Sequence, residues 1–374
     1  MKLLSDLIAQ EGGNISNSEV VDCEIILNEL KGSDLWRHPI QEFEDKFDNV
    51  LLTGATGFVG IYLLQKILEK TSNAIVYCLV RATDIGLAKA RIIKNMSFYG
   101  LFKEEYLERI VPVLGHLEKE HFGIPKELYI NLAHKIDYIY NTAAEMDLIS
   151  NFEKLKKVNV VGTLEIIKFS TYGKSKKIIH TSTLSIFSSN DKKSIDESTN
   201  IQDEKHYHSS GYASSKWMSE MLLFHFKEKG LPIQIHRLGL ITGDRISGRM
   251  PISQWFPRFL KSCYEMGEYP LGYEVPITPV DFVASSIYEL SRLSDGSDGV
   301  FHISNEINLP IEKFFCEHRQ SKVLIPLEGT VWFNSQYQKS KSRPLDISPF
   351  LDARITKIDE NDKIEMNFSS SNKK

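Results

Sequence analysis

The sequence predicts an α/β protein built on a doubly wound parallel sheet. Short apolar runs alternate with amphipathic segments from Val50 to Ile303. The first run ends in a glycine-rich turn, Gly54 to Gly60, that leads directly into a helical pattern. The apolar runs show little polar alternation, which indicates strands that helices cover on both faces.

The periodicity of apolar residues predicts each element in turn. Apolar runs predict strands over residues 50–53, 75–80, 110–114, 136–140, 177–181, 233–238 and 300–303. Helical spacing predicts helices over residues 58–69, 86–97, 125–133, 154–170, 212–229 and 281–293. Two further helices, over residues 3–10 and 19–30, are expected before the sheet and are separated by Gly12 and Gly13.

This order suggests a division of the chain. We expect an N-terminal helical extension (1–48), a Rossmann-type nucleotide-binding core that holds the active site (49–241), an aromatic-rich insertion that caps the substrate side (242–278), a return to the core (279–303), a partly helical C-terminal substrate lid (304–368) and a disordered tail (369–374). Within the core, the polar stretch 188–210 is too long for an ordinary connection, so it is predicted to be a surface loop.

Composition limits the class of partner. The 374 residues carry a formal net charge of -4, which gives no bulk attraction to nucleic acid or to an anionic membrane. No signal peptide and no apolar stretch of membrane-spanning length is apparent, so we expect a cytoplasmic protein. The 4 cysteines form no C-x-x-C pair, and His206 and His208 have no third ligand nearby, so no metal site is expected.

The turn after the first strand has the context of a dinucleotide-binding fingerprint. Gly54 permits a tight turn, Gly57 lets the main chain approach a pyrophosphate, and Gly60 lets the helix pack closely on the strand. The N–H groups at the start of the helix would then face phosphate oxygens. A purely structural glycine-rich turn is the alternative.

Arg81 follows the second strand, where an NAD-binding fold usually carries an acidic residue for the ribose 2′-hydroxyl. An arginine at this place accepts the 2′-phosphate of NADP instead, and Arg91 on the next helix adds a second charge. We therefore predict NADPH as the cofactor. The alternative is a surface arginine at the end of a strand.

Tyr212 and Lys216 stand at positions i and i+4, on one face of a predicted helix. A nearby ammonium favours the phenolate, so Lys216 is expected to lower the pKa of the Tyr212 phenol. Thr183 follows the predicted strand 177–181, and its hydroxyl can donate a hydrogen bond to a substrate oxygen. The alternative is that this hydroxyl only stabilises an ordinary turn at the end of the strand. Cys78 lies in a predicted buried strand, so direct hydride transfer is preferred to a cysteine nucleophile.

Several segments resemble those of the extended short-chain dehydrogenase/reductases. More narrowly, they resemble the thioester reductase domains that end nonribosomal peptide synthetases and carboxylic acid reductases. The similar segments are LLTGATGFVG, YCLVRA, NTAAEMD, NVVGT, STLSIF, GYASSKWMSE, HRLGLITGDRISG and PVDFVASSI.

The resemblance implies a role for each matching residue. It places Thr183, Tyr212 and Lys216 in the active site, with Tyr212 and Lys216 also against the cofactor. It implies that the pyrophosphate is held by Gly54, Thr56, Gly57, Phe58 and Gly60, that the adenosine phosphate faces Arg81 and Arg91, and that the strand end beneath the cofactor is lined by Asn141, Thr142 and Ala143.

The chain departs from the family pattern at three places. His116 replaces an aspartate in Gly-Asp-Leu, Asn141 replaces a histidine, and Leu238 replaces the proline of Arg-Pro-Gly. The first departure removes the aspartate that usually contacts the adenine in this family. None of the three removes a catalytic group.

The resemblance implies reduction of an acyl or peptidyl thioester, carried on the phosphopantetheine of a carrier protein, to an aldehyde; a second round would give the alcohol. We expect a monomer, or a part of a larger synthetase, because the chain has no room for adenylation or carrier domains. The alternatives are a fatty acyl-CoA reductase, a nucleotide-sugar epimerase or dehydratase, whose usual NAD is disfavoured by Arg81, and a non-catalytic NADP-binding scaffold.

Overall fold

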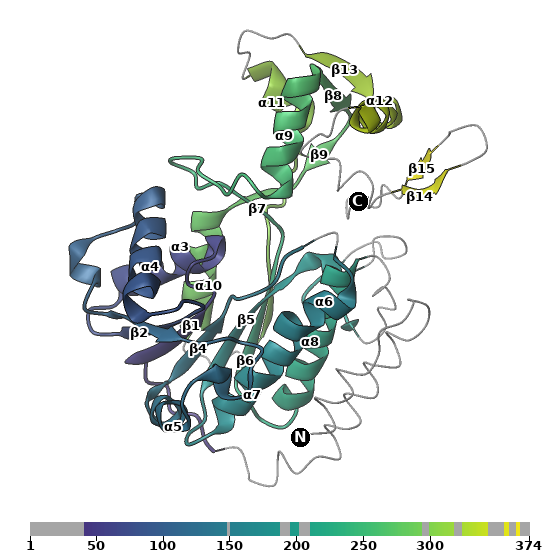
Figure 1. Ribbon diagram of the computed structural model, residues 1–374. Coiled ribbons are helices and arrows are strands. Elements are labelled where there is room, and N and C mark those ends of the chain that lie inside the picture. Colours follow the sequence, from purple (N-terminus) through teal and green to yellow (C-terminus); the bar gives the residue numbers. More distant parts are fainter. Residues whose placement is uncertain are drawn as a thin grey trace.

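The computed structural model describes residues 41–147, 150–187, 195–201, 210–293, 299–317, 324–342, 355–358 and 364–366. Its centre is a seven-stranded sheet with the order β11-β6-β5-β4-β1-β2-β3, in which all neighbouring strands run parallel (Figure 1). The strands are β1 (Asn49–Thr53), β2 (Ile75–Val80), β3 (Ile110–Leu114), β4 (Tyr138–Asn141), β5 (Lys177–Thr183), β6 (Ile233–Leu238) and β11 (Val300–Ile303). The predicted doubly wound architecture is confirmed.

Helices cover both faces of the sheet. One face carries α3 (Phe58–Lys70), α4 (Ile85–Tyr99) and α10 (Val280–Ser291), and the other carries α5 (Lys126–Lys135), α6 (Phe152–Lys156), α7 (Gly162–Thr171) and α8 (Gly211–Lys227). Successive strand residues point to opposite faces. In β1, Leu51 accordingly packs in one apolar cluster, while Val50 and Leu52 pack in the other.

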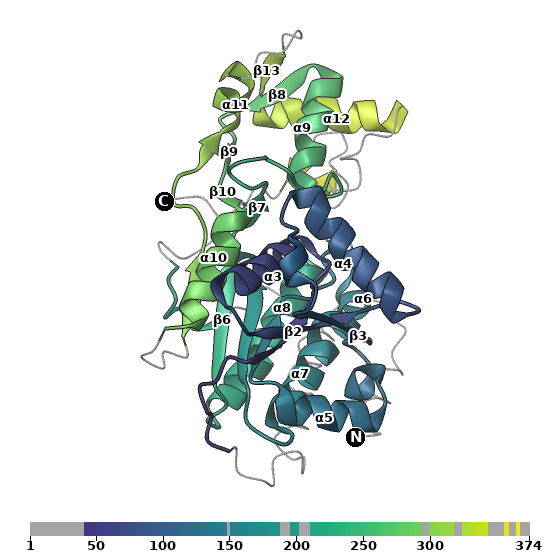
Figure 2. The same cartoon turned by 90° about the vertical axis from the view of Figure 1, so that its left-hand side faces the viewer.

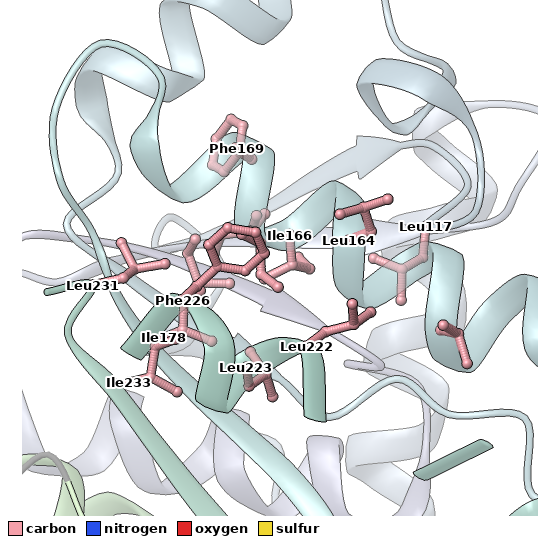
Figure 3. Close-up of a cluster of buried hydrophobic side chains, with 14 of the residues drawn as sticks. Leu117, Leu164, Ile166, Phe169, Ile178, Leu222, Leu223, Phe226, Leu231 and Ile233 are labelled. Atoms are coloured by element: carbon pink, nitrogen blue, oxygen red, sulfur yellow. The ribbon is translucent and has the colours of Figure 1, made fainter. Parts of the chain in front are cut away.

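Figure 3 shows how the first of these clusters is built. Side chains of α7 and α8 meet over the strands, and Phe169 and Phe226 belong to the same cluster as Ile178 of β5 and Ile233 of β6. These side chains are almost completely removed from water. Burial of this apolar surface fixes α8 against β5, and α8 is the helix that carries the predicted tyrosine and lysine.

The helix predicted over residues 154–170 is longer and less regular than expected. It begins at Phe152 and contains a π-helical turn, Lys157–Val161, between α6 and α7. Such turns insert one extra residue per turn and occur often at functional sites. Here the turn contains Asn159, whose side chain bonds to a neighbouring helix and loop, as described below.

A smaller lobe lies beyond the carboxyl end of β6 (Figures 1 and 2). It is reached through β7 (Leu240–Thr242), which pairs in parallel with β10 (Ile277–Pro279). The lobe contains α9 (Trp255–Met266), β8 (Glu268–Leu271), β9 (Glu274–Val275), β12 (Leu309–Pro310), α11 (Ile311–Glu317), β13 (Ile325–Glu328) and α12 (Gly329–Ser342). Strands β8 and β13 pair in parallel, and β9 and β12 pair antiparallel.

The lobe has its own apolar cluster, which includes Phe256, Phe259, Phe315, Trp332 and Phe333. Its members come from both the aromatic-rich segment 242–278 and the segment 304–368. The two segments that the sequence suggested as separate units therefore pack against each other.

The remaining short elements are the 3₁₀ turns η2 (Glu104–Tyr106), η3 (Glu120–Gly123) and η5 (Leu184–Ile186), and the antiparallel pair β14 (Ile355–Ile358) and β15 (Ile364–Met366). The predicted helices 3–10 and 19–30, the tail 369–374, and His206 and His208 lie outside the described residues. Within the parts of the chain that are described, no helix has both the length and the apolar character needed to cross a bilayer.

Candidate active site

The glycine-rich turn between β1 and α3 has the conformation that its sequence predicts. Gly54 has a φ of 74°, in the left-handed region that favours glycine. A Cβ atom on Gly54 would lie 2.7 Å from the nitrogen of Ala143, and one on Gly60 would lie 2.1 Å from the carbonyl oxygen of Gly54. The turn and the close packing of α3 therefore require glycine at both positions.

The start of α3 presents main-chain groups to solvent. Gly57 is the exposed residue before the helix, and its N–H donates to the carbonyl of Gly54 at 2.8 Å. Asn95 of α4 donates to the carbonyl of Thr56 at 2.9 Å, which holds the loop in place. The ring of Phe58 packs against Tyr62 and Tyr99 and is therefore turned to other side chains. The main-chain N–H of Phe58, at the start of the helix, is then the group of this residue that can bind a ligand. A helix N-terminus of this kind binds anions.

Arg81 and Arg91 lie together at the carboxyl end of β2. Both side chains are exposed, and the guanidinium of Arg91 donates to the carbonyl of Arg81 at 3.1 Å. Two cations at this place raise the local positive potential and favour an anionic group there. The two arginines that were expected to face the adenosine phosphate therefore lie next to each other.

Thr183 and Tyr212 come from adjacent elements. Thr183 is the last residue of β5 and is buried; its Oγ1 accepts from the N–H of Ser185 at 3.1 Å and so caps the turn η5. That bond uses an oxygen lone pair and leaves the hydroxyl hydrogen to donate elsewhere. Tyr212 is the second residue of α8, whose first turn is capped by the hydroxyl of Ser210.

Lys216 does not act on Tyr212 as expected. Its Nζ donates to the carbonyl of Thr181 at 2.7 Å and contacts Nε2 of His180 at 2.9 Å, both in β5. Burial lowers the pKa of Lys216 to about 8, and burial raises the pKa of the Tyr212 phenol to about 12. The prediction that Lys216 lowers the pKa of this phenol is therefore wrong for this arrangement, because the lysine is directed at the strand.

The residues at the end of β4 join it to β1. The hydroxyl of Thr142 donates to the carbonyl of Thr53 at 2.6 Å, and the N–H of Ala143 donates to Oγ1 of Thr53 at 3.1 Å. The side chain of Asn141 is buried and bonds to Thr53 Oγ1 at 2.7 Å and to His180 Nδ1 at 3.0 Å. These residues lie at the strand end as expected, but the Asn141 side chain faces the interior.

A buried ion pair lies one helical turn beyond Lys216. Glu220 of α8 accepts from Nε and Nη2 of Arg237 in β6, the shortest distance being 2.8 Å, and neither side chain is exposed. Burial raises the pKa of Glu220, and the charge of Arg237 opposes this shift. Arg237 also lies 4.8 Å from the ring centroid of Phe187. The pair joins the helix of the active site to the sheet.

Sequence reasoning did not assign a role to Asn159 or His180. The Asn159 side chain accepts from the N–H of Glu145 at 2.8 Å and donates to Ser215 Oγ at 2.9 Å, so it holds α8 beside the loop that follows β4. Asn159 stands in one of the similar segments, which is the signal that could have found it. His180 stands inside an apolar strand, where a histidine gives no signal of its own.

Two further expectations concern metals and thiols. Within the described residues, no group of three or more His, Cys, Asp or Glu side chains could hold a metal ion. Cys78 lies in β2 and is buried, as predicted, and burial raises its pKa well above the usual value. A thiol in this state is a poor nucleophile.

His116, which stands where the family pattern has an aspartate, follows β3. Its Nδ1 lies 3.6 Å from Oε1 of Glu118.

The sheet order, the glycine turn at the start of α3 and a Tyr–Lys pair that follows β5 are the features of an extended short-chain dehydrogenase/reductase. Comparison with protein families agrees, because residues 52–287 match the model of the NAD-binding family described as Male sterility protein. The chain belongs to this family.

The relatives narrow the class. A linear gramicidin synthase from Brevibacillus parabrevis is 32% identical over 301 residues, which are 78% of this chain and 6% of that protein. Glycine betaine reductase ATRR from Emericella nidulans is 31% identical over 265 residues, which are 68% of this chain and 21% of that protein. This chain thus corresponds to a small part of the length of either relative.

A solved structure corresponds to the chain over most of its length. The terminal R domain from the myxalamid PKS-NRPS biosynthetic pathway is 30% identical, with a TM-score of 0.80, and the match covers 84% of this chain and 80% of that one. The predicted relationship to the terminal reductase domains of nonribosomal peptide synthetases is therefore confirmed.

Proposed function

We propose that this protein uses NADPH to reduce an acyl or peptidyl thioester, held on a carrier protein, to an aldehyde. The observation that carries the proposal is the bond from Lys216, one turn after Tyr212 on α8, to the carbonyl of Thr181 at 2.7 Å, two residues before Thr183 at the end of β5. Ligands of open α/β sheets bind at this edge. A second round of reduction would give the alcohol.

The residues of the site suit a reduction. NADPH, when bound, supplies a hydride to the thioester carbonyl. Tyr212, with a pKa of about 12, keeps its proton at neutral pH and so can donate it to the oxygen on which negative charge develops. The hydroxyl hydrogen of Thr183 is a second donor to the same oxygen. Loss of the thiol from the resulting hemithioacetal then releases the aldehyde.

The site also fits the cofactor. The exposed start of α3 at Gly57 would hold the pyrophosphate, and Arg81 and Arg91 would hold the 2′-phosphate of the adenosine. Lys216 would contact the nicotinamide ribose. The preference for NADPH over NADH depends on the two arginines.

The carrier-bound form of the substrate is supported by the class of relatives. The gramicidin synthase is far longer than this chain, and the similar R domain belongs to a PKS-NRPS pathway. We infer that the acyl group enters from the side of the small lobe, which lies beyond the carboxyl end of the sheet (Figure 2). The chain would then act on a separate carrier, or as one part of a larger synthetase.

A substrate panel tests the proposal. The protein is incubated with NADPH or NADH and with an acyl group on a carrier protein, on pantetheine, on coenzyme A, or with a nucleotide sugar, and the aldehyde is trapped and quantified. We expect the highest kcat/KM with the carrier-bound acyl group. Faster reduction of a long-chain acyl-CoA would favour a fatty acyl-CoA reductase, and turnover of a nucleotide sugar alone would contradict the proposal.

Replacing Arg81 by alanine is expected to weaken NADPH binding by about 10- to 100-fold, the value of a charge-assisted hydrogen bond of about 1.5–3 kcal/mol. NADH affinity should change little, because NADH has no 2′-phosphate. Fluorescence titration with each nucleotide measures both affinities. Lys94→Ala removes an exposed cation from the same helix as Arg91 and is the control. An equal loss of NADPH and NADH affinity in Arg81→Ala would contradict the assigned role.

A further inference from the structure

A chain of buried polar side chains runs beneath the active site, from β1 to α8. Oγ1 of Thr53 donates to Oδ1 of Asn141 at 2.7 Å, and Nδ2 of Asn141 lies 3.0 Å from Nδ1 of His180. Nε2 of His180 lies 2.9 Å from Nζ of Lys216, which also donates to the carbonyl of Thr181 at 2.7 Å. All four side chains in this chain are almost fully buried.

The positions of the hydrogens follow from the donors available. The amide nitrogen of Asn141 is a donor only, so Nδ1 of His180 must accept from it. A neutral imidazole then carries its hydrogen on Nε2, which faces Lys216. Nε2–H can donate to Lys216 only if the amine has a lone pair, and an ammonium group has none. This set of hydrogen bonds therefore requires a neutral Lys216.

A charged Lys216 requires a different set. The ammonium would donate to Nε2 of His180, whose hydrogen would then lie on Nδ1 and need an acceptor. The side-chain amide of Asn141 would have to turn so that its oxygen faces the imidazole. Its nitrogen would then face Thr53, whose hydroxyl hydrogen would lose the acceptor that it has now. An unmade hydrogen bond in a buried site is costly.

The charged groups around these four side chains shift the pKa values of Lys216 and His180 in opposite directions. Glu220, one turn along α8, raises the pKa of Lys216 and is itself paired with Arg237 of β6. Burial, Lys216 and His236 of β6 all lower the pKa of His180, which keeps the imidazole neutral. Among these four hydrogen-bonded side chains, the amine of Lys216 is therefore the group that changes charge near neutral pH.

We propose that His180, oriented by Asn141, is a positioning residue that stabilises the neutral amine of Lys216 and so sets the pH at which Lys216 gains its charge. Its consequence for catalysis rests on the proposed function, in which Lys216 contacts the nicotinamide ribose of the cofactor. The hydrogen-bond chain itself does not depend on the substrate.

A titration of Lys216 tests the proposal without any substrate. The protein is labelled with ¹³C-lysine, and the ε-carbon resonance of Lys216 is identified by its loss in Lys216→Arg. We expect a midpoint near pH 8 in the unchanged protein. In His180→Gln, the amide oxygen can accept from an ammonium group, so the midpoint should rise by about one pH unit or more, a tenfold change in proton affinity.

Two further variants complete the design. Asn141→Ala removes the donor to Nδ1 and lets His180 carry its hydrogen on either nitrogen, so the midpoint should rise by a smaller amount. His236→Gln replaces a buried histidine of β6 that contacts Gln234 and should leave the midpoint in place. An unchanged midpoint in both His180→Gln and Asn141→Ala, or an equal rise in His236→Gln, would overturn the proposal.

The pH profile of turnover separates this proposal from the proposed function. If thioester reduction is observed, the limb of the kcat profile that reports Lys216 should move with the NMR midpoint in His180→Gln, with a smaller change in KM for NADPH. If no thioester is reduced but the midpoint moves, the proposed function fails and the role of His180 stands. If thioester reduction is observed and the midpoint does not move, the proposed function stands and the role of His180 fails.

Discussion

Replacing Tyr212 by phenylalanine is expected to lower kcat for thioester reduction by about 10²- to 10⁴-fold, the usual contribution of a positioned proton donor. The ring stays in place at the start of α8, so NADPH affinity should remain nearly unchanged. The loss arises because burial holds the pKa of this phenol at about 12, which makes its hydroxyl a proton donor at neutral pH. Stopped-flow measurement of NADPH oxidation separates kcat from cofactor binding.

The control for this variant is Tyr172→Phe, which removes the hydroxyl of a partly exposed tyrosine just after α7. Its turnover should equal that of the unchanged protein. Thr183→Val should lower kcat by a smaller factor than Tyr212→Phe, because it removes one of two donors to the same oxygen. Full turnover in Tyr212→Phe would show that the proton comes from another group.

Replacing Arg237 by methionine is expected to lower the free energy of unfolding by about 3–5 kcal/mol, the cost of leaving a buried charge without its partner. Arg237 and Glu220 are both completely buried, and two nitrogens of Arg237 contact the carboxylate. Without Arg237, Glu220 must stay charged without its closest cation or take up a proton. Urea unfolding, followed by circular dichroism, measures the change.

An exposed ion pair provides the control. Arg245 donates to Asp281 at 2.7 Å, but the Arg245 side chain is 63% exposed. Water screens such a pair, so Arg245→Met should change the unfolding free energy little. The double variant Glu220→Leu with Arg237→Met should regain much of the stability lost in Arg237→Met, because neither charge of the pair is then left buried without its partner. A small loss in Arg237→Met alone would mean that water reaches Glu220.

Local patterns predicted most of the central sheet. Strands β2, β3, β6 and β11 have the bounds that their apolar runs indicated, since polar residues or turns border each run. The conformations of Gly54 and Gly60 were predicted for the same reason, because a turn between a strand and a helix is specified by adjacent residues. Features that depend on nearby residues can be read from the chain.

Features that depend on distant residues were not predicted. The π-helical turn places Asn159 against Ser215, which lies on another helix. The direction of Lys216 is set by His180 and Thr181 of β5, so the spacing from Tyr212 alone suggested the wrong partner. The small lobe joins segments on either side of α10 and β11. None of these pairings leaves a periodic signal in the sequence.

The separate apolar cluster of the small lobe has a consequence for divergence within the family. Substitutions among Phe256, Phe259 and Trp332 alter the packing of the lobe without entering the two clusters that hold the central sheet. If the lobe contacts the acyl group, substrate range can drift while the alignment of β5 and α8 is conserved. A protein that carries the small lobe of another member of the family should then have the substrate preference of the lobe donor. Its cofactor preference should remain that of the protein that supplies the central sheet.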